Sequence, residues 1–351
     1  MSEIEASRDA GPTVSRAVSH IGPVLEIVRA SKAFQFKDRR FGPSRRLVAV
    51  REASLDIYPG QTVAIIGESG CGKSTLGRLA TGELAPDSGS VMIAGRPVQA
   101  LERAERARLV QPIPQDPKAA LDPRWTVGRS LAEPLRLHRI CSNGEIQASV
   151  DAALAKVGLD TAIAARFPRE VSGGEAQRIV IARALLLSPK ALVCDEAVSA
   201  LDAAVQSDII DLLLAIQKRE RTALVFISHD LTLVGRIADR IEILYLGEIV
   251  ESLPPDRLGR PGQHPYTSAL TGAMPRIGRG PRNRKRATLA GEVPSPVERP
   301  AGCVFHPRCP HAVDRCRTTV PPSVEVAPGH RMTCHLAGTL ALQTERGGGV
   351  P

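Results

Sequence analysis

The sequence is poor in aromatic residues and contains no long apolar run. Phe, Trp and Tyr make up 3% of its 351 residues, which argues against a surface that stacks nucleic-acid bases. A bilayer-spanning helix needs about 20 consecutive apolar residues, and no stretch reaches that length. No apolar segment follows Arg8 and Arg16, so we expect no secretory signal. The chain should stay in the cytoplasm, where its seven cysteines should not form structural disulfides.

The composition is otherwise that of a globular protein with a basic excess. Hydrophobic residues make up 43% of the chain, enough for a sizeable aliphatic core, and the formal net charge is +9. Such a charge admits anionic partners such as nucleotides. Part of the excess is concentrated between Arg276 and Arg286. That stretch is interpreted either as a solvated linker or as a contact with a membrane surface.

Apolar periodicity indicates an α/β fold with a mixed or largely parallel sheet, because buried aliphatic strands alternate with helices. The expected strands are Leu25–Val28, Thr62–Ile66, Ser90–Ile93, Ala191–Cys194, Ala223–Ile227 and Ile241–Tyr245. The expected helices are Lys73–Gly82, Val127–His138, Glu145–Val157, Gly174–Leu187, Val205–Arg219 and Leu231–Ala238. The expected organisation is a disordered leader (1–22), an ATPase-like domain (23–253) with a helical insertion (about 117–170), a small irregular module (254–340) and a disordered tail (341–351).

A complete G-x-x-x-x-G-K-[ST] pattern follows the apolar strand at Thr62–Ile66 and opens a helix, which is the context this phosphate-binding motif requires. The glycines let successive backbone N–H groups point at phosphate oxygens. Lys73 should reach the outer phosphates, Ser74 should ligate Mg²⁺, and Thr75 can donate to an inner phosphate. The residues assigned to nucleotide binding are Gly67, Ser69, Gly70, Cys71, Gly72, Lys73, Ser74 and Thr75.

A second strand ends in two adjacent carboxylates, Asp195 and Glu196. Two charges at the end of a buried strand are costly unless a cation or substrate engages them. Because side chains alternate along a strand, the two carboxylates should point in different directions. We assign Asp195 to the Mg²⁺ shell and Glu196 to the general base that activates water.

Between these motifs lies Val171-Ser172-Gly173-Gly174-Glu175, which resembles the ABC signature, usually Leu-Ser-Gly-Gly-Gln. With it, the sequence resembles an ABC-type P-loop ATPase. The resemblance implies that Ser172, Gly173 and Gly174 contact the γ-phosphate held by a partner subunit. The carboxylate of Glu175, in place of the usual amide, should be less favourable to a phosphate.

Further positions match this family. Gln115 resembles the Q-loop glutamine that senses Mg²⁺, Asp202 the D-loop residue at the dimer interface, and His229 the switch histidine that contacts the γ-phosphate. The resemblance also implies an aromatic residue stacked on adenine, either Phe34 or Phe36, of which Phe34 is the better match. Every one of these assigned positions precedes Asp230, so the nucleotide site should lie wholly before that residue.

The C-terminal part narrows the resemblance to dipeptide and oligopeptide importer ATPases, a branch that also transports nickel and other small solutes. The matching stretches are His264-Pro265-Tyr266-Thr267 and the nine residues from Gly302 to Pro310. The resemblance implies ATP and Mg²⁺ as ligands and a place on the cytoplasmic face of the bacterial inner membrane. It also implies a second ATPase subunit (a paralogue in many such transporters), two transmembrane permease subunits and, indirectly, a periplasmic binding protein, with no nucleic acid. The solute itself cannot be named from this chain.

Two rival functions come from other classes. A DNA-repair ABC ATPase would carry a long coiled coil between phosphate loop and signature, and a ribosomal one would carry two nucleotide domains; neither is found here. A third alternative is a non-transport ABC ATPase that serves as an accessory subunit of a cytosolic complex, but the C-terminal motifs argue against it.

Four cysteines, Cys303, Cys309, Cys316 and Cys334, are separated by five, six and seventeen residues. Structural zinc sites usually use pairs spaced by two to four residues, whereas these wider spacings and the Cys309-Pro310 pair favour a [4Fe–4S] cluster. The importer branch is associated with such a cluster. Zn²⁺ is the alternative, and unligated thiols are the third. A structural role for the metal is expected, so ATP hydrolysis should largely survive its loss.

Overall fold

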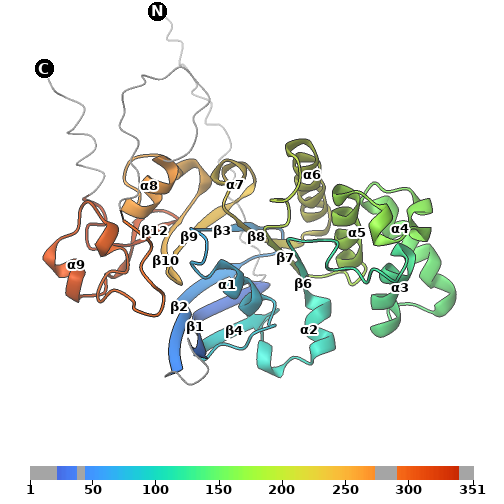
Figure 1. Cartoon of the computed structure of the whole chain (residues 1–351), viewed down its shortest axis with the longest axis horizontal. Coiled ribbons are helices and arrows are strands. Elements are labelled where there is room, and N and C mark those ends of the chain that lie inside the picture. The colour runs from blue at the N-terminus through green and yellow to red at the C-terminus, as the bar shows by residue number, and fades with distance from the viewer. Residues whose placement is uncertain (1–21, 38–43, 273–290, 340–351) are drawn as a thin grey trace, which may run out of the picture.

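The computed structural model describes residues 22–37, 44–272 and 291–339 (Figure 1). The leader expected over residues 1–22 (apart from Gly22), the basic stretch from Arg276 to Arg286 and the tail over 341–351 lie outside the described residues. Two sheets and nine α-helices make up this described part.

The main sheet has eight strands in the order β11-β12-β10-β9-β3-β8-β7-β6. Strands β9, β3, β8, β7 and β6 run parallel, and β10, β12 and β11 continue the sheet in antiparallel fashion. Their bounds are β3 Thr62–Ile66, β6 Val110–Ile113, β7 Ala191–Asp195, β8 Ala223–Ser228, β9 Arg240–Tyr245, β10 Glu248–Leu253, β11 Ser323–Ala327 and β12 His330–Thr333. All residues of β3 and β8 are buried, which explains their continuous apolar runs.

A second sheet is antiparallel, in the order β2-β1-β4-β5, with β1 Leu25–Lys37, β2 Ser44–Ile57, β4 Ser88–Ile93 and β5 Arg96–Pro97. The six strands expected from periodicity are all present, although β1 is far longer than Leu25–Val28. Strand β2 was missed because Arg45, Arg46 and Arg51 interrupt its apolar residues and its first half shows no alternation of buried and exposed positions.

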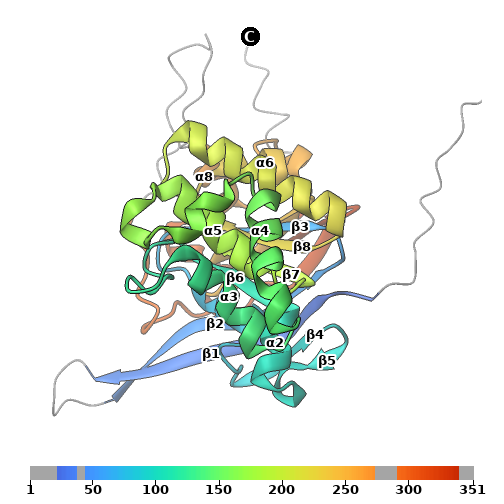
Figure 2. The ribbon, with the colours of Figure 1, turned by 90° about the vertical axis from the view of Figure 1, so that its right-hand side faces the viewer.

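The six expected helices are present within two residues of their predicted ends. The helices are α1 Lys73–Ala80, α2 Arg103–Leu109, α3 Val127–Leu137, α4 Ile146–Lys156, α5 Gly173–Leu185, α6 Ala203–Glu220, α7 Leu231–Ile237, α8 Pro265–Gly272 and α9 Asp314–Thr318. Residues 117–167 contain no strand, as predicted for the helical insertion. Helices α3, α4 and α5 gather at the end of the molecule beyond β6 (Figures 1 and 2).

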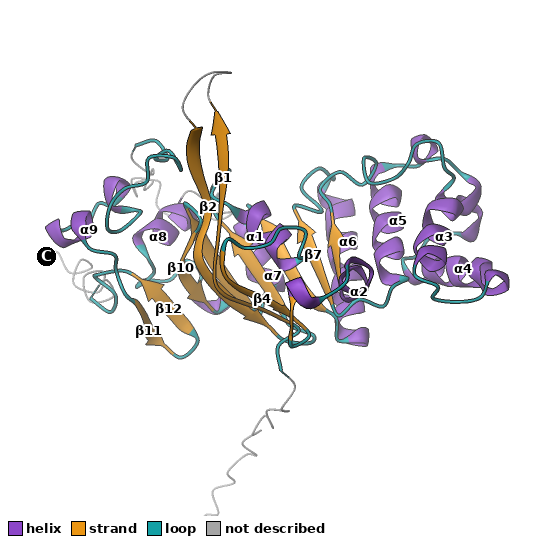
Figure 3. Ribbon diagram, turned by 90° about the horizontal axis from the view of Figure 1, so that it is seen from below, coloured by secondary structure: helices purple, strands orange, loops and turns teal. Residues whose placement is uncertain are grey.

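The C-terminal module is built against the main sheet. Strand β12 pairs with β10, with Glu251 opposite Met332 and Ser252 opposite Arg331, and Figure 3 shows the β11–β12 hairpin beside β10. Tyr245 of β9 and Tyr266 of α8 have ring centroids 4.7 Å apart, and Phe305 meets Tyr245 edge-on at 5.2 Å. This aromatic cluster, Tyr245, Tyr266 and Phe305, joins the module to the ATPase part.

Candidate functional site

The phosphate loop lies between β3 and α1, as its sequence predicts. Gly72 has φ +108°, and a Cβ atom there would lie 2.2 Å from the Ala49 carbonyl oxygen, so both its backbone angle and its surroundings require glycine. Lys73 is buried, and its Nζ donates to the carbonyl oxygens of Gly67 at 2.8 Å and Glu68 at 2.9 Å. The lysine is thus folded back over the loop, at the place where phosphates would bind.

A cavity of about 270 Å³ opens over the loop. It is lined by Phe34, Leu47, Val48, Ala49, Ser69, Gly70, Cys71, Gly72, Lys73, Ser74, Thr75, Glu196, Leu246 and Pro296. Phe34 lines it and Phe36 does not, which favours Phe34 as the aromatic that faces a nucleotide base. Leu246 and Pro296 were missed, because no motif marks them. The expectation that the site lies wholly before Asp230 is therefore wrong for the cavity wall.

Asp195, at the end of β7, accepts a hydrogen bond from the Ser74 hydroxyl. Burial raises the pKa of the Asp195 carboxyl, and the neighbouring Glu196 adds to this, while Ser74 and Lys73 oppose it. A cation beside the carboxylate would relieve the cost of its burial. A hydroxyl next to a carboxylate is also a donor set that Mg²⁺ accepts, so the residues present fit that ion.

Glu196 follows the last residue of β7, outside the strand, and its carboxylate contacts other residues than that of Asp195. Its Oε2 accepts from Nε2 of Gln115 at 3.0 Å, and its Oε1 lies 3.5 Å from Nδ1 of His229. The φ angle of Glu196 is +50°, a conformation that a non-glycine residue rarely adopts. The structure therefore brings Gln115, Glu196 and His229 together, from segments far apart in the sequence.

The signature residues begin helix α5 and do not line the nucleotide cavity of the same chain. Ser172 caps the helix: its Oγ accepts from the Glu175 N–H at 3.2 Å, and Glu175 Oε2 accepts from the Ser172 N–H at 2.7 Å. This backbone hydrogen bond lowers the pKa of Glu175. Gly173 and Gly174 follow, and a Cβ on Gly174 would meet Val205 Cγ1 at 2.6 Å.

Asp202 also lies outside the cavity lining. Its Oδ1 accepts from the Val205 N–H at 3.0 Å and so caps helix α6. One chain therefore supplies the phosphate loop and the Glu196 carboxylate to this cavity, whereas its signature residues and Asp202 lie outside the cavity lining.

The four C-terminal cysteines are free thiols, three of them buried and Cys309 half-buried. Burial raises the pKa of Cys303 to about 12, and the thiols of Cys334, Cys316 and Cys309 lie near enough to raise it further. Burial likewise raises the pKa of Cys309 to about 11. The N–H of Cys303 donates to the Cys316 carbonyl at 2.9 Å. The four thiols thus share one neighbourhood.

No three His, Cys, Asp or Glu side chains within residues 22–37, 44–272 and 291–339 are close enough to hold a metal ion. As their side chains are placed in this described part, the four cysteines do not form a converged metal-binding group. Two histidines near the cysteines in sequence have other partners: His306 Nδ1 lies 2.9 Å from the Cys303 carbonyl oxygen, and His335 Nε2 lies 2.9 Å from that of Thr319. His311 is exposed.

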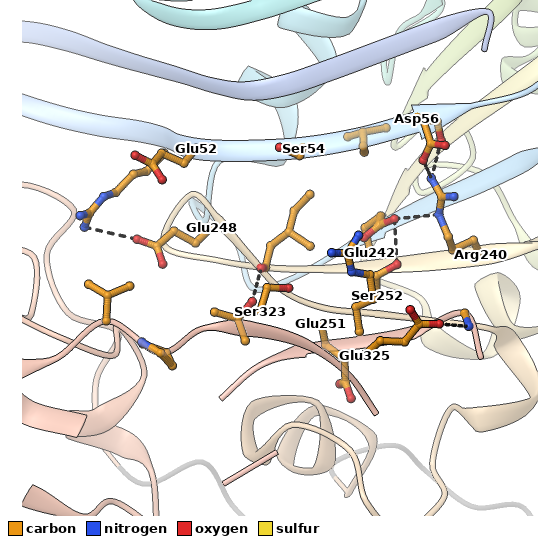
Figure 4. A pocket seen from close by; sticks show the side chains of 18 residues that line it. Glu52, Ser54, Asp56, Arg240, Glu242, Glu248, Glu251, Ser252, Ser323 and Glu325 are labelled. Carbon is orange, nitrogen blue, oxygen red and sulfur yellow. Dashed lines mark hydrogen bonds and ion pairs between the residues drawn. The ribbon is translucent and has the colours of Figure 1, made fainter. Parts of the chain in front are cut away.

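A larger hollow of about 500 Å³ lies between β2, β9, β10 and the β11–β12 hairpin (Figure 4). Six carboxylates and three arginines line it, so its charge is predominantly negative, which is unfavourable for a phosphate. Arg240 lies 2.9 Å from both Asp56 and Glu242, and Arg51 lies 3.4 Å from Glu248. It holds none of the predicted nucleotide-binding residues. We therefore place the nucleotide site at the smaller cavity.

Two protein families match the chain. The ABC transporter family matches residues 50–199, and the oligopeptide/dipeptide transporter C-terminal region matches residues 250–316. The second match includes Cys303, Cys309 and Cys316.

Similar curated proteins cover most of this chain. A probable peptide ABC transporter ATP-binding protein of Sinorhizobium fredii is 46% identical over 84% of each chain. The di/tripeptide transport ATP-binding protein DppF of Pseudomonas aeruginosa is 42% identical, over 82% of this chain and 90% of its own. The oligopeptide transport ATP-binding protein OppF of Haemophilus influenzae is 38% identical, over 89% and 96% respectively.

Solved structures support the fold. A dimeric ATP-binding cassette in a post-hydrolysis state with ADP and Pi has a TM-score of 0.58 at 24% identity, covering 66% of this chain and 98% of that one. The cbiO1 subunit of an ABC transporter complex from Clostridium perfringens has a TM-score of 0.58 at 24% identity, covering 67% and 90%. None of the helices that the structure describes has the length and apolarity needed to cross a membrane.

Proposed function

The chain belongs to the ABC transporter ATPases that carry the oligopeptide/dipeptide transporter C-terminal region, and from that premise we propose that it hydrolyses ATP to drive peptide import. Its place would be the cytoplasmic face of the bacterial inner membrane. The proposal rests on one observation: Lys73, Glu196 and Phe34 line the same cavity. The C-terminal match and the relatives favour peptides as the solute.

The phosphate loop would bind the triphosphate. Lys73 donates to the neutral carbonyl oxygens of Gly67 and Glu68, and an ATP phosphate is a stronger hydrogen-bond partner for its ammonium group. The N–H groups at the start of α1 would complete the phosphate contacts. Phe34 would stack on the adenine, since it lines the same cavity.

Hydrolysis would rest on Glu196. Its carboxylate would take the proton of the water whose oxygen bonds to the γ-phosphorus, as the bond from that phosphorus to the ADP oxygen breaks. Gln115 lies beside one oxygen of the Glu196 carboxylate and His229 beside the other. Both residues would orient this carboxylate and the γ-phosphate. Ser74, Asp195 and Gln115 would hold Mg²⁺, which neutralises phosphate charge when bound.

The working unit would be a pair of ATPase subunits. Ser172, Gly173, Gly174 and Asp202 do not line this chain's own cavity, which agrees with a role at the cavity of a second subunit. We propose a paralogous ATPase as that partner, together with two transmembrane permease subunits and, through them, a periplasmic binding protein. No role in nucleic-acid binding is proposed.

We further propose that Cys303, Cys309, Cys316 and Cys334 hold a [4Fe–4S] cluster. What supports this is the set of four neighbouring free thiols in a module with few apolar runs. A cluster distributes its ligands over several iron atoms, so its thiols need not converge on one point as they must around Zn²⁺.

The transport proposal is tested in cells that lack the chain and are complemented with it. ATP-dependent uptake of labelled di-, tri- and pentapeptides should return with the wild-type chain and not with Lys73→Ala. If nickel uptake returned and uptake of no peptide did, the chain would serve an importer of nickel and not of peptides. Recovery of neither, with ATPase activity intact in cytosolic fractions, would favour a non-transport function.

A further inference from the structure

The C-terminal module reaches the phosphate loop through one ion pair. Arg308 donates from its two terminal nitrogens to Glu68: Nη1 to Oε2 at 2.7 Å and Nη2 to Oε1 at 3.1 Å. The Arg308 side chain is 5% exposed and that of Glu68 is 23% exposed. Such a two-point pair fixes both position and orientation of a carboxylate. Glu68 is the second residue of the phosphate-binding pattern, 240 residues before Arg308.

A second contact from the module holds the backbone at the same point. The N–H of Glu68 donates to the hydroxyl oxygen of Tyr266 at 2.8 Å. Tyr266 is fully buried in the aromatic cluster of Tyr245, Tyr266 and Phe305. Phe305 is three residues before Arg308, so both contacts begin from one packed unit.

The charge of Glu68 bears directly on nucleotide binding. Lys73 contacts the backbone oxygen of Glu68 at 2.9 Å, so an unpaired Glu68 carboxylate would compete with ATP for the lysine's ammonium group. The same carboxylate would also repel the phosphates. With Arg308 in place, Glu68 is neutralised and does not line the cavity.

We infer that Arg308 is a positioning residue of the nucleotide site: it acts through Glu68 to keep the phosphate loop open and its lysine available to ATP. The inference rests on the proposed ATPase function and deepens it, because it makes the C-terminal module part of the nucleotide site. A substitution that removes the Arg308 charge should then lower nucleotide affinity, because it leaves the Glu68 carboxylate unpaired. Removing the charge of Glu68 as well should restore the affinity.

The test is a charge cycle in the full chain, with affinities for ADP and for a non-hydrolysable ATP analogue measured by calorimetry. Arg308→Gln should weaken binding by about five- to tenfold, since it leaves an unpaired anion near the phosphates. Glu68→Gln should stay within about twofold of wild type, and the double variant should recover to about that level. Arg308→Lys, which keeps the charge but not the two-point geometry, should fall between.

Arg315→Gln is the matched control, because Arg315 lies in the same module and contacts only the His335 carbonyl, at 3.2 Å, among the interactions described. It should leave affinity unchanged. If Arg308→Gln weakened binding and Glu68→Gln failed to restore it, Arg308 would merely hold the module together and the inference would be wrong.

Normal affinity in Arg308→Gln would also overturn the inference while leaving the ATPase proposal intact. A wild-type chain that bound neither nucleotide would overturn the ATPase proposal, and the inference with it. Thermal unfolding of each variant shows whether a loss of binding reflects a loss of fold. Restored binding in the double variant would show that the loss came from the unpaired Glu68 charge.

Discussion

Gln115 and Glu196 lie 81 residues apart in the sequence, yet the Gln115 amide donates to the Glu196 carboxylate across 3.0 Å. Gln115 follows β6 and Glu196 follows β7, two parallel neighbours whose carboxyl ends meet at one edge of the sheet. On the other side of the same carboxylate is His229, which follows β8. Three adjacent strands thus deliver the side chains proposed to carry out hydrolysis.

We predict that Glu196→Gln binds ATP normally but hydrolyses it at least about 100-fold more slowly. The amide keeps an oxygen that can accept from Gln115 but cannot take a proton from water. ATP turnover and nucleotide affinity, measured on the same preparation, check this. Glu102→Gln, on the exposed start of α2, is the matched control and should keep full activity. Turnover within a few-fold of wild type would remove Glu196 from the role of base.

We predict that Lys73→Ala loses nucleotide binding itself, unlike Glu196→Gln. Nothing else would supply a flexible cation to the outer phosphates at that point, and a charge-assisted hydrogen bond contributes about 1.5–3 kcal/mol. Calorimetric titration with ADP and with an ATP analogue should show affinity reduced by about tenfold or more. Unchanged affinity would show that Lys73 does not bind the outer phosphates.

The phosphate loop, the acidic strand end and most buried strands could be predicted because their signals are local. The loop pattern, its preceding strand and its following helix are contiguous in the sequence, and β3 matches its expected bounds of Thr62–Ile66. Gln115 and His229 were assigned from the family resemblance alone, because strand β6, which precedes Gln115, was not among the expected strands.

The contribution of the C-terminal module could not be predicted, because it depends on pairing between distant segments. Strand β12 is four residues long and joins β10 across about 80 residues of weakly patterned sequence. Pro296 lines the cavity and Arg308 contacts Glu68, and both residues lie in the segment between β10 and β12. No periodicity or motif spacing encodes such a contact.

We predict that the protein loses stability on acidification because of His264. Burial lowers the pKa of its imidazole to about 4, whereas the ordinary value is 6.5. Between those pH values the unfolded chain binds a proton that the folded chain does not. The free energy of unfolding should therefore fall as the pH drops from 6.5 to 4, by about 3 kcal/mol in total.

His264→Asn isolates this contribution. The asparagine oxygen can still accept from the Tyr266 N–H, as His264 Nδ1 does at 3.1 Å, but it does not titrate. Denaturant unfolding at pH 7.5 and pH 5 should show a smaller loss of stability in the variant than in wild type. His138→Asn, at a half-buried position, is the control; equal losses in all three proteins would contradict the prediction.

The cysteine cluster yields the last prediction. Protein purified without air should be brown and contain about four iron atoms per chain. Ser in place of Cys303, Cys309, Cys316 or Cys334 should each remove the iron, because a hydroxyl is a poor substitute for a soft thiolate. Cys141→Ser, in the helical insertion, should retain it.

The expectation that ATP hydrolysis survives loss of the metal stays a prediction, and Arg308, which lies between Cys303 and Cys309 and holds Glu68, offers a way to test it. If the metal anchors that segment, Cys309→Ser should weaken ADP binding as Arg308→Gln does, and the addition of Glu68→Gln should restore it. If the protein contained stoichiometric zinc and no iron, the cysteines would hold a zinc ion instead of a cluster. If the folded chain contained no metal and its four thiols were reactive, both the cluster and the zinc alternative would be wrong. If iron-free Cys309→Ser bound ADP with normal affinity, Arg308 would stay in place without the cluster.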